Sequence, residues 1–382
     1  MSGRLLRLVC TAAIAAGAVL VPAPVPVQAS AAPGPRDSGA PAAERPVAEL
    51  LTDLQRLYRE AEKATETYNA TEEQLKRQRT EVTRLNGRLT AARLALHGSR
   101  GAAGRLARQQ YQGRSELSSY VQLLLARDPQ HALDQGHVIR QVSQERAGTM
   151  ERLAGDEQRT DELARRARTA LDGRLTLAER QKKDRDLVRE RLKDVEELLA
   201  SLTEEQLSRV AELERSGVAK AQDELVASGA LSSTRRPTSE GGAALRYAVA
   251  QIGKPYEWGA EGPDSYDCSG LTSQAWTDAG RPVPRTSQEQ WAELPHIPLT
   301  DLRPGDLVVY FPEATHVAMY LGDGLVVQAP RPGARIKVSP IAANPILGAV
   351  RPDPSGKPLR GYTPPKLPDN ATDGSDEGYD TH

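Results

Sequence analysis

The residue best suited to covalent chemistry in this chain is Cys268, within the sequence YDCSGL. The only other cysteine, Cys10, lies in an N-terminal apolar stretch that has the features of an export signal. Exported proteins use cysteines mostly in pairs, so a single thiol is a candidate nucleophile rather than a crosslink. The pattern predicts a helix over 268–279, whose dipole favours the thiolate of a cysteine in its first turn, and Asp267 is placed to cap that turn.

A cysteine nucleophile works with a histidine that holds the ion pair and passes the proton to the leaving group. Between residues 243 and 352 the histidines are His296 and His316. His296 lies between prolines in an expected loop and is interpreted as a surface residue. His316 begins an expected apolar strand with the sequence HVAMYL, and it is therefore the predicted base.

A third group should fix the imidazole by accepting a hydrogen bond from its other nitrogen. Gln328 is the candidate, and the turn GDG at 322–324 decides whether it can serve. A two-residue loop places Gln328 on the face away from His316, whereas a three-residue loop brings it opposite Ala318 and onto the histidine's face. We expect the three-residue loop, because its two glycines allow the positive φ that such a loop requires.

These residues need a scaffold, and residues 243–352 have the mixed pattern of an α+β domain. All three tryptophans and the only phenylalanine lie between residues 258 and 311, which indicates one compact core there. Helices are expected at 243–252, 268–279 and 287–294, followed by strands at 307–311, 316–321, 325–328 and 336–338. A Gly- and Ser-rich linker over 228–242 should precede the domain, and a disordered tail over 353–382 should follow it.

Upstream of this domain, residues 46–227 have a helical pattern. Apolar residues recur every seven positions from Leu54 to Leu96, which predicts a coiled-coil helix of about 75 Å if ~50 residues take part. The companion core positions are mostly polar, so this seam is weak. The sequence HGSRG at 97–101 should end the helix, and a small apolar tip around 117–125 and a second helical run from residue 132 to residue 227 should follow.

The simplest arrangement of two long helical runs in one chain is an antiparallel hairpin, and a parallel homodimer of the first helix is the alternative. Residues 1–31 are expected to be a signal peptide, and residues 32–45, rich in Ala, Pro and Gly, a disordered spacer. A net charge of −1 gives no electrostatic reason to expect nucleic acid as a partner. No grouping of His, Cys and carboxylates has metal-ligand spacing, so neither a metal nor another cofactor is predicted.

The C-terminal domain resembles the NlpC/P60 cell-wall peptidases, which are papain-like cysteine enzymes in circularly permuted order. The resemblance covers about residues 243–352 and is carried by five sequences in the family's order, GKPYEWG, DCSGL, PRTS, RPGDL and HVAMYLG. It implies hydrolysis of a peptide bond in bacterial peptidoglycan, typically between D-glutamate and a diamino acid of the stem peptide. Cys268 would be the nucleophile and His316 the base.

The resemblance also gives roles to residues near the nucleophile. Tyr256 would help to hold the oxyanion together with the backbone amide of the cysteine, and Asp267 and Ser269 would line the substrate pocket. Two positions depart from the family's pattern. The third catalytic position is often histidine in the family, and Gln328 orients the imidazole without supplying charge. Ala260 replaces a glycine, which is expected to narrow the cleft slightly.

The helical region resembles the coiled coils of division-linked members of the family, in which a membrane complex gates the enzyme. A long helical hairpin with a partly polar seam can bind a membrane-bound division or transporter-like complex, or it can fold over the cleft of its own enzyme domain. We therefore expect an enzyme that its own hairpin restrains. The expected function is a secreted, cell-wall-associated peptidoglycan endopeptidase in wall remodelling or daughter-cell separation. The alternatives are a non-catalytic adaptor that recruits or activates another wall hydrolase, and a papain-like enzyme that transfers acyl groups or cleaves amides outside the wall.

Overall fold

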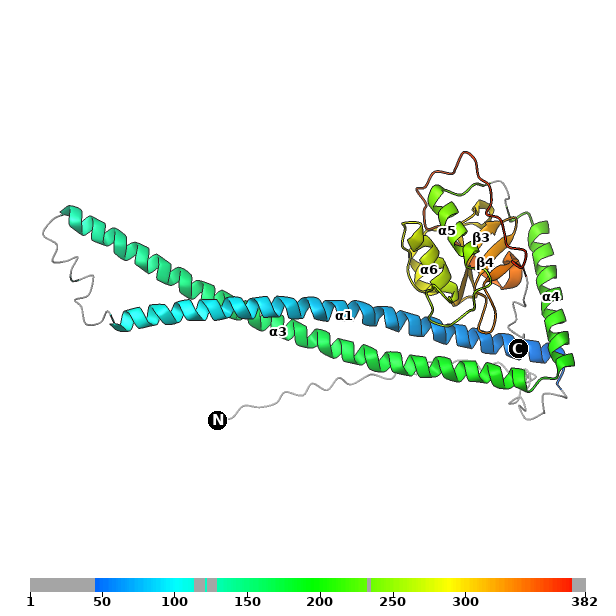
Figure 1. Cartoon of the computed structure of the whole chain (residues 1–382), viewed down its shortest axis with the longest axis horizontal. Helices are drawn as coiled ribbons and strands as arrows, with labels where there is room; N and C mark the ends of the chain where they lie inside the picture. The colour runs from blue at the N-terminus through cyan, green and yellow to red at the C-terminus, as the bar shows by residue number, and fades with distance from the viewer. Residues whose placement is uncertain (1–44, 113–120, 122–128, 232–234, 373–382) are drawn as a thin grey trace, which may run out of the picture. The chain divides into compact units, whose positions relative to one another are not determined.

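The computed structural model describes residues 45–112, 121, 129–231 and 235–372 (Figure 1). The predicted signal peptide, all of the predicted spacer except Arg45, nearly all of the predicted apolar tip and residues 373–382 of the predicted tail lie outside the described residues. Within the described ranges, no helix combines the length and the apolar character that a membrane crossing requires.

The helices α1 (Val47–Gln112) and α3 (Pro129–Ala200) pack against each other in opposite directions (Figure 1). Thr71 on α1 donates a hydrogen bond of 2.7 Å to Asp184 on α3, and Ser99, farther along α1, bonds Asp156. The predicted antiparallel hairpin is therefore confirmed. Most of the seven-residue stripe is buried as expected, namely Leu54, Ala61, Leu75, Val82, Leu89 and Leu96.

The predicted end of the first helix at 97–101 is wrong. α1 continues through Gly98 and Gly101 to Gln112. A glycine inside a helix costs only about 1 kcal/mol relative to alanine. α3 lies alongside this stretch and bonds it through Ser99. Packing between the helices therefore outweighs the local signal for a break.

The second predicted helical run is a pair of helices rather than one. α3 ends at Ala200, and α4 (Glu204–Ala227) begins after Thr203. The Thr203 hydroxyl accepts from the Gln206 backbone, while the Gln206 side chain accepts from the Thr203 backbone. This capping box is visible in the sequence as TEEQ, a start signal that the helical prediction overlooked. α4 packs against α1 and against the short 3-10 turn η4 (Ile341–Ala343).

Among the described residues, the C-terminal domain has a six-stranded sheet in the order β1-β6-β2-β3-β4-β5, with antiparallel neighbours throughout. The strands are β1 (His296–Ile297), β2 (Leu307–Tyr310), β3 (His316–Gly322), β4 (Leu325–Gln328), β5 (Lys337–Pro340) and β6 (Ile346–Val350). The helices α5 (Ser239–Ala250), α6 (Cys268–Asp278) and α7 (Ser287–Glu293), and the 3-10 turn η3 (Leu299–Asp301), complete it.

The predicted α+β layout is confirmed, with differences at its edges. β1 has only two residues, too few for a pattern, and β6 contains a glycine, so neither strand was predicted. α5 begins at Ser239, inside the predicted linker, because Thr238 caps it by accepting from the Gly241 backbone. The end of the linker thus belongs to the domain.

Each face of the sheet has its own hydrophobic core. On one face lie α5 and α6 (Figure 1). Their Leu245 and Leu271 belong to the same buried cluster as Val317 of β3. On the other face, Tyr320 packs in a cluster that Leu225 of α4 joins. Full burial of such a side chain contributes roughly 1.5–3 kcal/mol. The helical region therefore shares a core with the sheet through α4.

The hairpin between β3 and β4 differs in detail from the prediction. Gly322 pairs with Leu325, so the turn has two residues rather than three. The register then shifts between Tyr320 and Gly322, because a β-bulge takes up one residue, and Tyr320 pairs with Val326. The predicted loop length is wrong, but the bulge restores the register that was predicted for Gln328.

Candidate active site

Cys268 is the first residue of α6 and is almost fully buried, with 2% of its surface exposed. Asp267 caps the helix as predicted, and its side chain accepts a hydrogen bond of 2.6 Å from the Gly270 backbone. The thiol lies near the backbone N–H of Val317, close to the start of β3. The helix start thus places the thiol beside the strand that carries His316.

His316 and Gln328 meet on neighbouring strands. His316 Nε2 lies 2.8 Å from Gln328 Oε1, and both side chains are buried. With the amide oxygen as acceptor, Nε2 carries the proton and Nδ1 is the basic nitrogen. A general base needs such a fixed tautomer, so the geometry fits the roles predicted for both residues.

Arg285 was given no role from the sequence, and the structure places it in contact with two predicted pocket residues. Its Nη1 donates to Asp267 Oδ1 at 3.0 Å and to Ser269 Oγ at 2.8 Å, and its Nη2 donates to Asp267 Oδ2 at 2.8 Å. Arg285 and Asp267 are both buried, so each compensates the other's charge. Asp267 thereby anchors Arg285 in addition to capping α6. The only sequence signal for Arg285 was its place in the run PRTS.

Tyr256 is buried in the same core as Cys268. Burial, and then the charge of a nearby Cys268 thiolate, raise the pKa of the phenol well above its ordinary value. The phenol is therefore neutral and able to donate a hydrogen bond, which is what an oxyanion donor requires.

A carboxylate from α1 fills the cleft beside the thiol. Glu66 Oε1 accepts a hydrogen bond of 2.7 Å from Ser269 Oγ and lies 3.9 Å from the Cys268 sulfur. Glu66 Oε2 accepts from the backbone N–H of Ser287, the first residue of α7, at 2.7 Å. The nearby Arg285 adds positive charge. We call the carboxylate site formed by Ser269, Ser287 and Arg285 the Glu66 pocket.

One helical turn earlier on α1, Glu62 faces the imidazole. Its Oε1 lies 3.5 Å from His316 Nδ1. The side chain is buried, and its second oxygen, Oε2, has no hydrogen-bond partner among the described residues. Glu62 and Glu66 thus lie against the two residues of the predicted catalytic pair.

Loss of solvent shifts the pKa values of these groups upward. Burial raises the pKa of Glu62 to about 8 and that of Glu66 to about 7, and for Glu66 the charge of Asp267 adds to the effect. Burial, followed by the charge of Glu66, also raises the pKa of the Cys268 thiol well above its ordinary value. The expectation that the helix dipole favours the thiolate is therefore wrong for this conformation, in which burial and the nearby carboxylates outweigh the dipole.

Further contacts connect α1 to the rim of the cleft. Asn69 Nδ2 donates to Asp267 Oδ2 at 3.0 Å. The Tyr68 ring packs edge-on against Trp258, with 5.1 Å between the ring centroids. α1 therefore uses one face for α3 and another for the C-terminal domain.

Sequence reasoning did not identify Glu62, Glu66 or Asn69. They lie off the seven-residue stripe, at positions where polar side chains are usually solvated. The weak seam was the only indication that this helix has a second partner. His296, by contrast, is exposed and stacks on Trp291 with 3.8 Å between the rings, in agreement with its interpretation as a surface residue.

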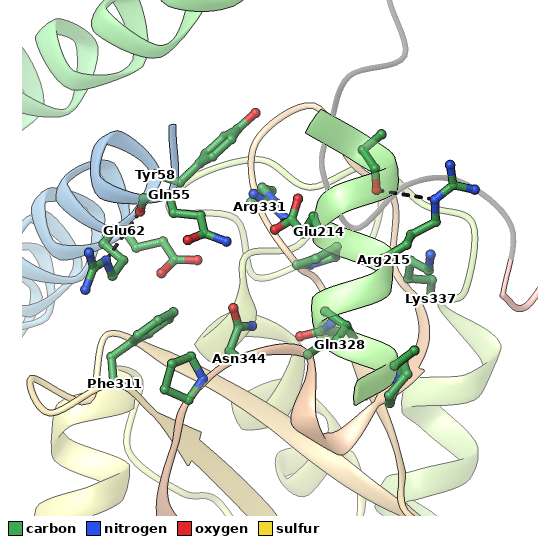
Figure 2. Close-up of a pocket in the computed structure, with 18 of the residues that line it drawn as sticks. Gln55, Tyr58, Glu62, Glu214, Arg215, Phe311, Gln328, Arg331, Lys337 and Asn344 are labelled. Carbon is green, nitrogen blue, oxygen red and sulfur yellow. Dashed lines mark hydrogen bonds and ion pairs between the residues drawn. The ribbon is translucent and has the colours of Figure 1, made fainter. Parts of the chain in front are cut away.

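A cavity of about 870 Å³ opens beside Gln328, between α1, α4 and the C-terminal domain (Figure 2). α1 contributes Tyr58 and Glu62 to its lining, and α4 contributes Glu214. Arg331 and several neighbouring residues of the C-terminal domain form the remaining wall. The cleft thus has a filled side at the Glu66 pocket and an open side beyond Gln328.

Residues 253–348 match the NlpC/P60 family. Over 113 residues the chain is 42% identical to the probable endopeptidase Cgl2188 of Corynebacterium glutamicum, in an alignment that covers 30% of this chain and 54% of that protein. Over 111 residues it is 38% identical to the peptidoglycan endopeptidase RipA of Mycolicibacterium smegmatis. That alignment covers 25% of this chain and 22% of RipA. Among solved structures, the NlpC/p60 domain of the peptidoglycan hydrolase SagA is 32% identical, covers 29% of this chain and 97% of that chain, and has a TM-score of 0.28.

The chain thus spans about half the length of the Corynebacterium relative and less of the Mycolicibacterium one. The family match includes Cys268, His316 and Gln328 and begins after α4. Residues 253–348 of this chain are therefore an NlpC/P60 domain.

Proposed function

We propose that this chain is an exported peptidoglycan endopeptidase that cleaves the bond between D-glutamate and a diamino acid of the stem peptide. The observation that carries the proposal is the Glu66 pocket beside Cys268. A D-glutamate linked through its side-chain carboxyl keeps a free α-carboxylate, so the acyl half of the substrate brings a carboxylate into the cleft. Ser269 Oγ and the Ser287 backbone N–H, each 2.7 Å from Glu66, are placed to bind that group. The names of the relatives support the same reaction class.

In the proposed mechanism, the Cys268 sulfur attacks the side-chain carbonyl of the D-glutamyl residue while His316 takes the thiol proton. The backbone N–H of Cys268 and the Tyr256 hydroxyl hold the oxyanion. His316 then donates its proton to the leaving amine, the diamino acid departs, and a thioester remains on the cysteine. Water, deprotonated by His316, hydrolyses the thioester and regenerates the thiol. Gln328 keeps the imidazole oriented throughout.

Digestion of purified peptidoglycan, with mass analysis of the released fragments, tests this function. The full chain and its Glu66→Ala variant should release stem-peptide fragments that end in D-glutamate, and the same chains with Cys268→Ala should release none. Thr277→Ala, also on α6, is the matched control and should behave like the parent chain. Fragments cut at another bond would contradict the assigned bond, and unchanged digestion by Cys268→Ala would contradict the nucleophile.

We further infer that α1 restrains the enzyme. A substrate carboxylate cannot enter the pocket while Glu66 fills it, and Glu62 lies 3.5 Å from the imidazole nitrogen that must act as base. Catalysis then requires α1 to leave the cleft. A membrane-bound division or transporter-like complex that binds the hairpin is the kind of partner that would move it, at the cell wall where the substrate lies.

Activity of the full chain tests the restraint. Glu66→Ala should hydrolyse stem peptides faster than the wild type, because it empties the carboxylate pocket. Glu81→Ala, which removes an exposed glutamate of α1 that pairs with Arg84, should leave the rate unchanged. Equal rates for wild type and Glu66→Ala would contradict the restraint and leave the assigned bond untouched.

The closed cleft also favours one alternative, a non-catalytic adaptor that recruits or activates another wall hydrolase. A buried thiol with a raised pKa is a poor nucleophile. The Cys268→Ala variant separates the two functions. An adaptor keeps its whole effect on a partner hydrolase without the thiol, whereas an endopeptidase loses its activity.

A further inference from the structure

The direction of the substrate in the cleft follows from the proposed mechanism. The histidine that protonates the leaving amine must lie on the amine side of the bond that is cut. His316 bonds Gln328, and Gln328 lines the cavity of about 870 Å³. That cavity therefore lies on the amine side, whereas the Glu66 pocket lies on the acyl side.

The amine-side cavity contains a nearly buried arginine, three residues beyond Gln328. The Arg331 side chain is 11% exposed, and its Nη2 lies 3.0 Å from Glu214 Oε1 of α4. Its guanidinium also lies 4.6 Å from the centroid of the Tyr58 ring of α1. Figure 2 shows Arg331 beside Glu214, with Glu62 on the α1 side of the cavity. Both contacts come from the helical region and not from the NlpC/P60 domain.

The two ends of the cleft thus have the same arrangement. On the acyl side, Glu66 of α1 is bound by donors of the NlpC/P60 domain. On the amine side, Glu214 of α4, whose side chain is 10% exposed, is bound by Arg331. In each case a carboxylate of the helical region occupies a position that faces the substrate once the helix has moved. Arginine binds carboxylates through a planar fork of N–H donors, so Arg331 suits another carboxylate at the same place.

We propose that Arg331 binds a free carboxylate on the diamino acid of the substrate, and that Glu214 occupies this subsite while the chain is at rest. The inference rests on the proposed function, because it requires a diamino acid on the amine side. Lys337 lines the same cavity and is the second positively charged side chain that the C-terminal domain contributes to the lining. The subsite favours a diamino acid whose side chain ends in a free carboxylate over one whose side chain ends in an amide or carries no such group.

Two synthetic peptides test the subsite: L-alanyl-γ-D-glutamyl-diaminopimelate with a free side-chain carboxylate, and the same peptide with that group amidated. Hydrolysis is measured with the full chain carrying Glu62→Ala, Glu66→Ala and Glu214→Ala, so that no carboxylate of the helical region occupies the acyl-side pocket or the Arg331 subsite. We expect kcat/KM to be about 10- to 100-fold higher for the free carboxylate, the range expected for a hydrogen bond to a charged group. Arg331→Gln should remove this preference by raising KM for the free-carboxylate peptide alone.

Arg335→Gln is the matched control, because Arg335 lies in the same loop, is exposed and bonds the Gly253 carbonyl. It should keep the preference. An equal loss on both peptides in Arg331→Gln would give Arg331 a structural role and overturn the subsite. The absence of any preference in the parent chain overturns it as well, while hydrolysis of both peptides leaves the proposed function intact.

Binding supplies a readout that does not depend on activity. In the same chain with Cys268→Ala added, calorimetry should show tighter binding of the free-carboxylate peptide, and Arg331→Gln should abolish the difference. If neither peptide is hydrolysed but this difference is present, the proposed endopeptidase function fails and the carboxylate subsite stands. Equal binding of the two peptides overturns the subsite in every case.

Discussion

The Glu66 carboxylate accepts a hydrogen bond of 2.7 Å from the Ser269 hydroxyl, although 203 positions separate the two residues in the chain. The serine belongs to the NlpC/P60 domain and the glutamate to α1, so this bond joins the helical region to the cleft. The same carboxylate oxygen lies 3.9 Å from the Cys268 sulfur. Access to the thiol therefore depends on a side chain outside the region that matches the family.

Removal of the Glu66 side chain should expose the thiol. In the full chain, Cys268 of the Glu66→Ala variant should react with iodoacetamide at least about 10-fold faster than in the wild type, because the variant loses two hydrogen bonds that hold the cover in place. Mass spectrometry of the labelled peptides measures the rate and separates Cys268 from Cys10.

Glu66→Gln is the matched control for that experiment. The amide fills nearly the same volume and keeps an oxygen that accepts from Ser269, but its NH2 group cannot accept from the Ser287 N–H. It should therefore protect the thiol better than alanine does, though less well than the wild-type side chain. Equal reactivity of the Ala and Gln variants would show that the charge, and not the cover, protects the thiol.

The docking of α1 should weaken as the pH rises. Glu62 and Glu66 have pKa values of about 8 and about 7 in the docked state, above the ordinary value of 4.5. The docked state therefore binds more protons than the released state. Its free energy is most favourable below about pH 4.5 and is lost as the pH rises through 7 to 8. The alkylation rate of Cys268, corrected for thiolate content with the Glu66→Ala chain, should thus rise between about pH 5 and about pH 8.5.

Other charged groups act on the same equilibrium and define the control. The charged or titratable groups facing Glu62 are Arg331, Glu66, Arg59 and His316, and those facing Glu66 are Asp267, Arg285 and the Cys268 thiol. The double variant Glu62→Gln/Glu66→Gln removes the carboxylate titration and keeps the imidazole. A flattened pH profile in this variant supports the prediction, and an unchanged slope assigns the effect to His316 instead.

The placement of the predicted site residues was predictable because it depends on local patterns. A helix start placed Cys268, an apolar strand placed His316, and pairing of adjacent strands placed Gln328. The loop length was the weak step. The glycines of the turn indicated positive φ, but a β-bulge before Gly322 depends on how the strands pair, which composition does not encode.

The closure of the cleft was predictable only in outline. The polar seam of the first helix indicated that this helix has another partner. The local sequence around Glu62 and Glu66, however, predicts side chains exposed to solvent. Their burial depends on a surface formed far along the chain. The same limit applies to Arg285, whose ion pair with Asp267 forms only when two loops of the domain meet.

Replacement of Gln328 should change the pH dependence of catalysis as well as its rate. Gln328→Ala leaves the His316 Nε2–H without its acceptor, so kcat/KM should fall about 10- to 100-fold, the range for a lost buried hydrogen bond. Gln328→Glu adds a negative charge that favours the imidazolium. His316 must lose its proton to act as the base, so the acid limb of the pH profile should move to higher pH. Gln328→His keeps an acceptor and should retain most of the activity.

These variants are compared in the Glu66→Ala chain with synthetic stem peptides. Gln222→Ala is the control, since Gln222 of α4 bonds the Gly324 carbonyl in the same hairpin but lies outside the catalytic pair. A loss in Gln328→Ala with no shift in the Glu variant would mean that Gln328 supports the fold and not the imidazole.

The close approach of α6 to the loop before it should make Gly270 intolerant of a side chain. A Cβ at this position would lie 2.1 Å from the Ala260 carbonyl oxygen and 2.9 Å from Asp267 Oδ1. Gly270→Ala must therefore displace backbone, which costs about 1–3 kcal/mol or more and lowers the melting temperature. Gly87→Ala on α1, where a Cβ would meet nothing within 4 Å, should leave stability unchanged or raise it by up to about 1 kcal/mol. Scanning calorimetry measures the melting temperatures of both variants. A Gly270→Ala chain with the same melting temperature as the wild type would contradict this contact.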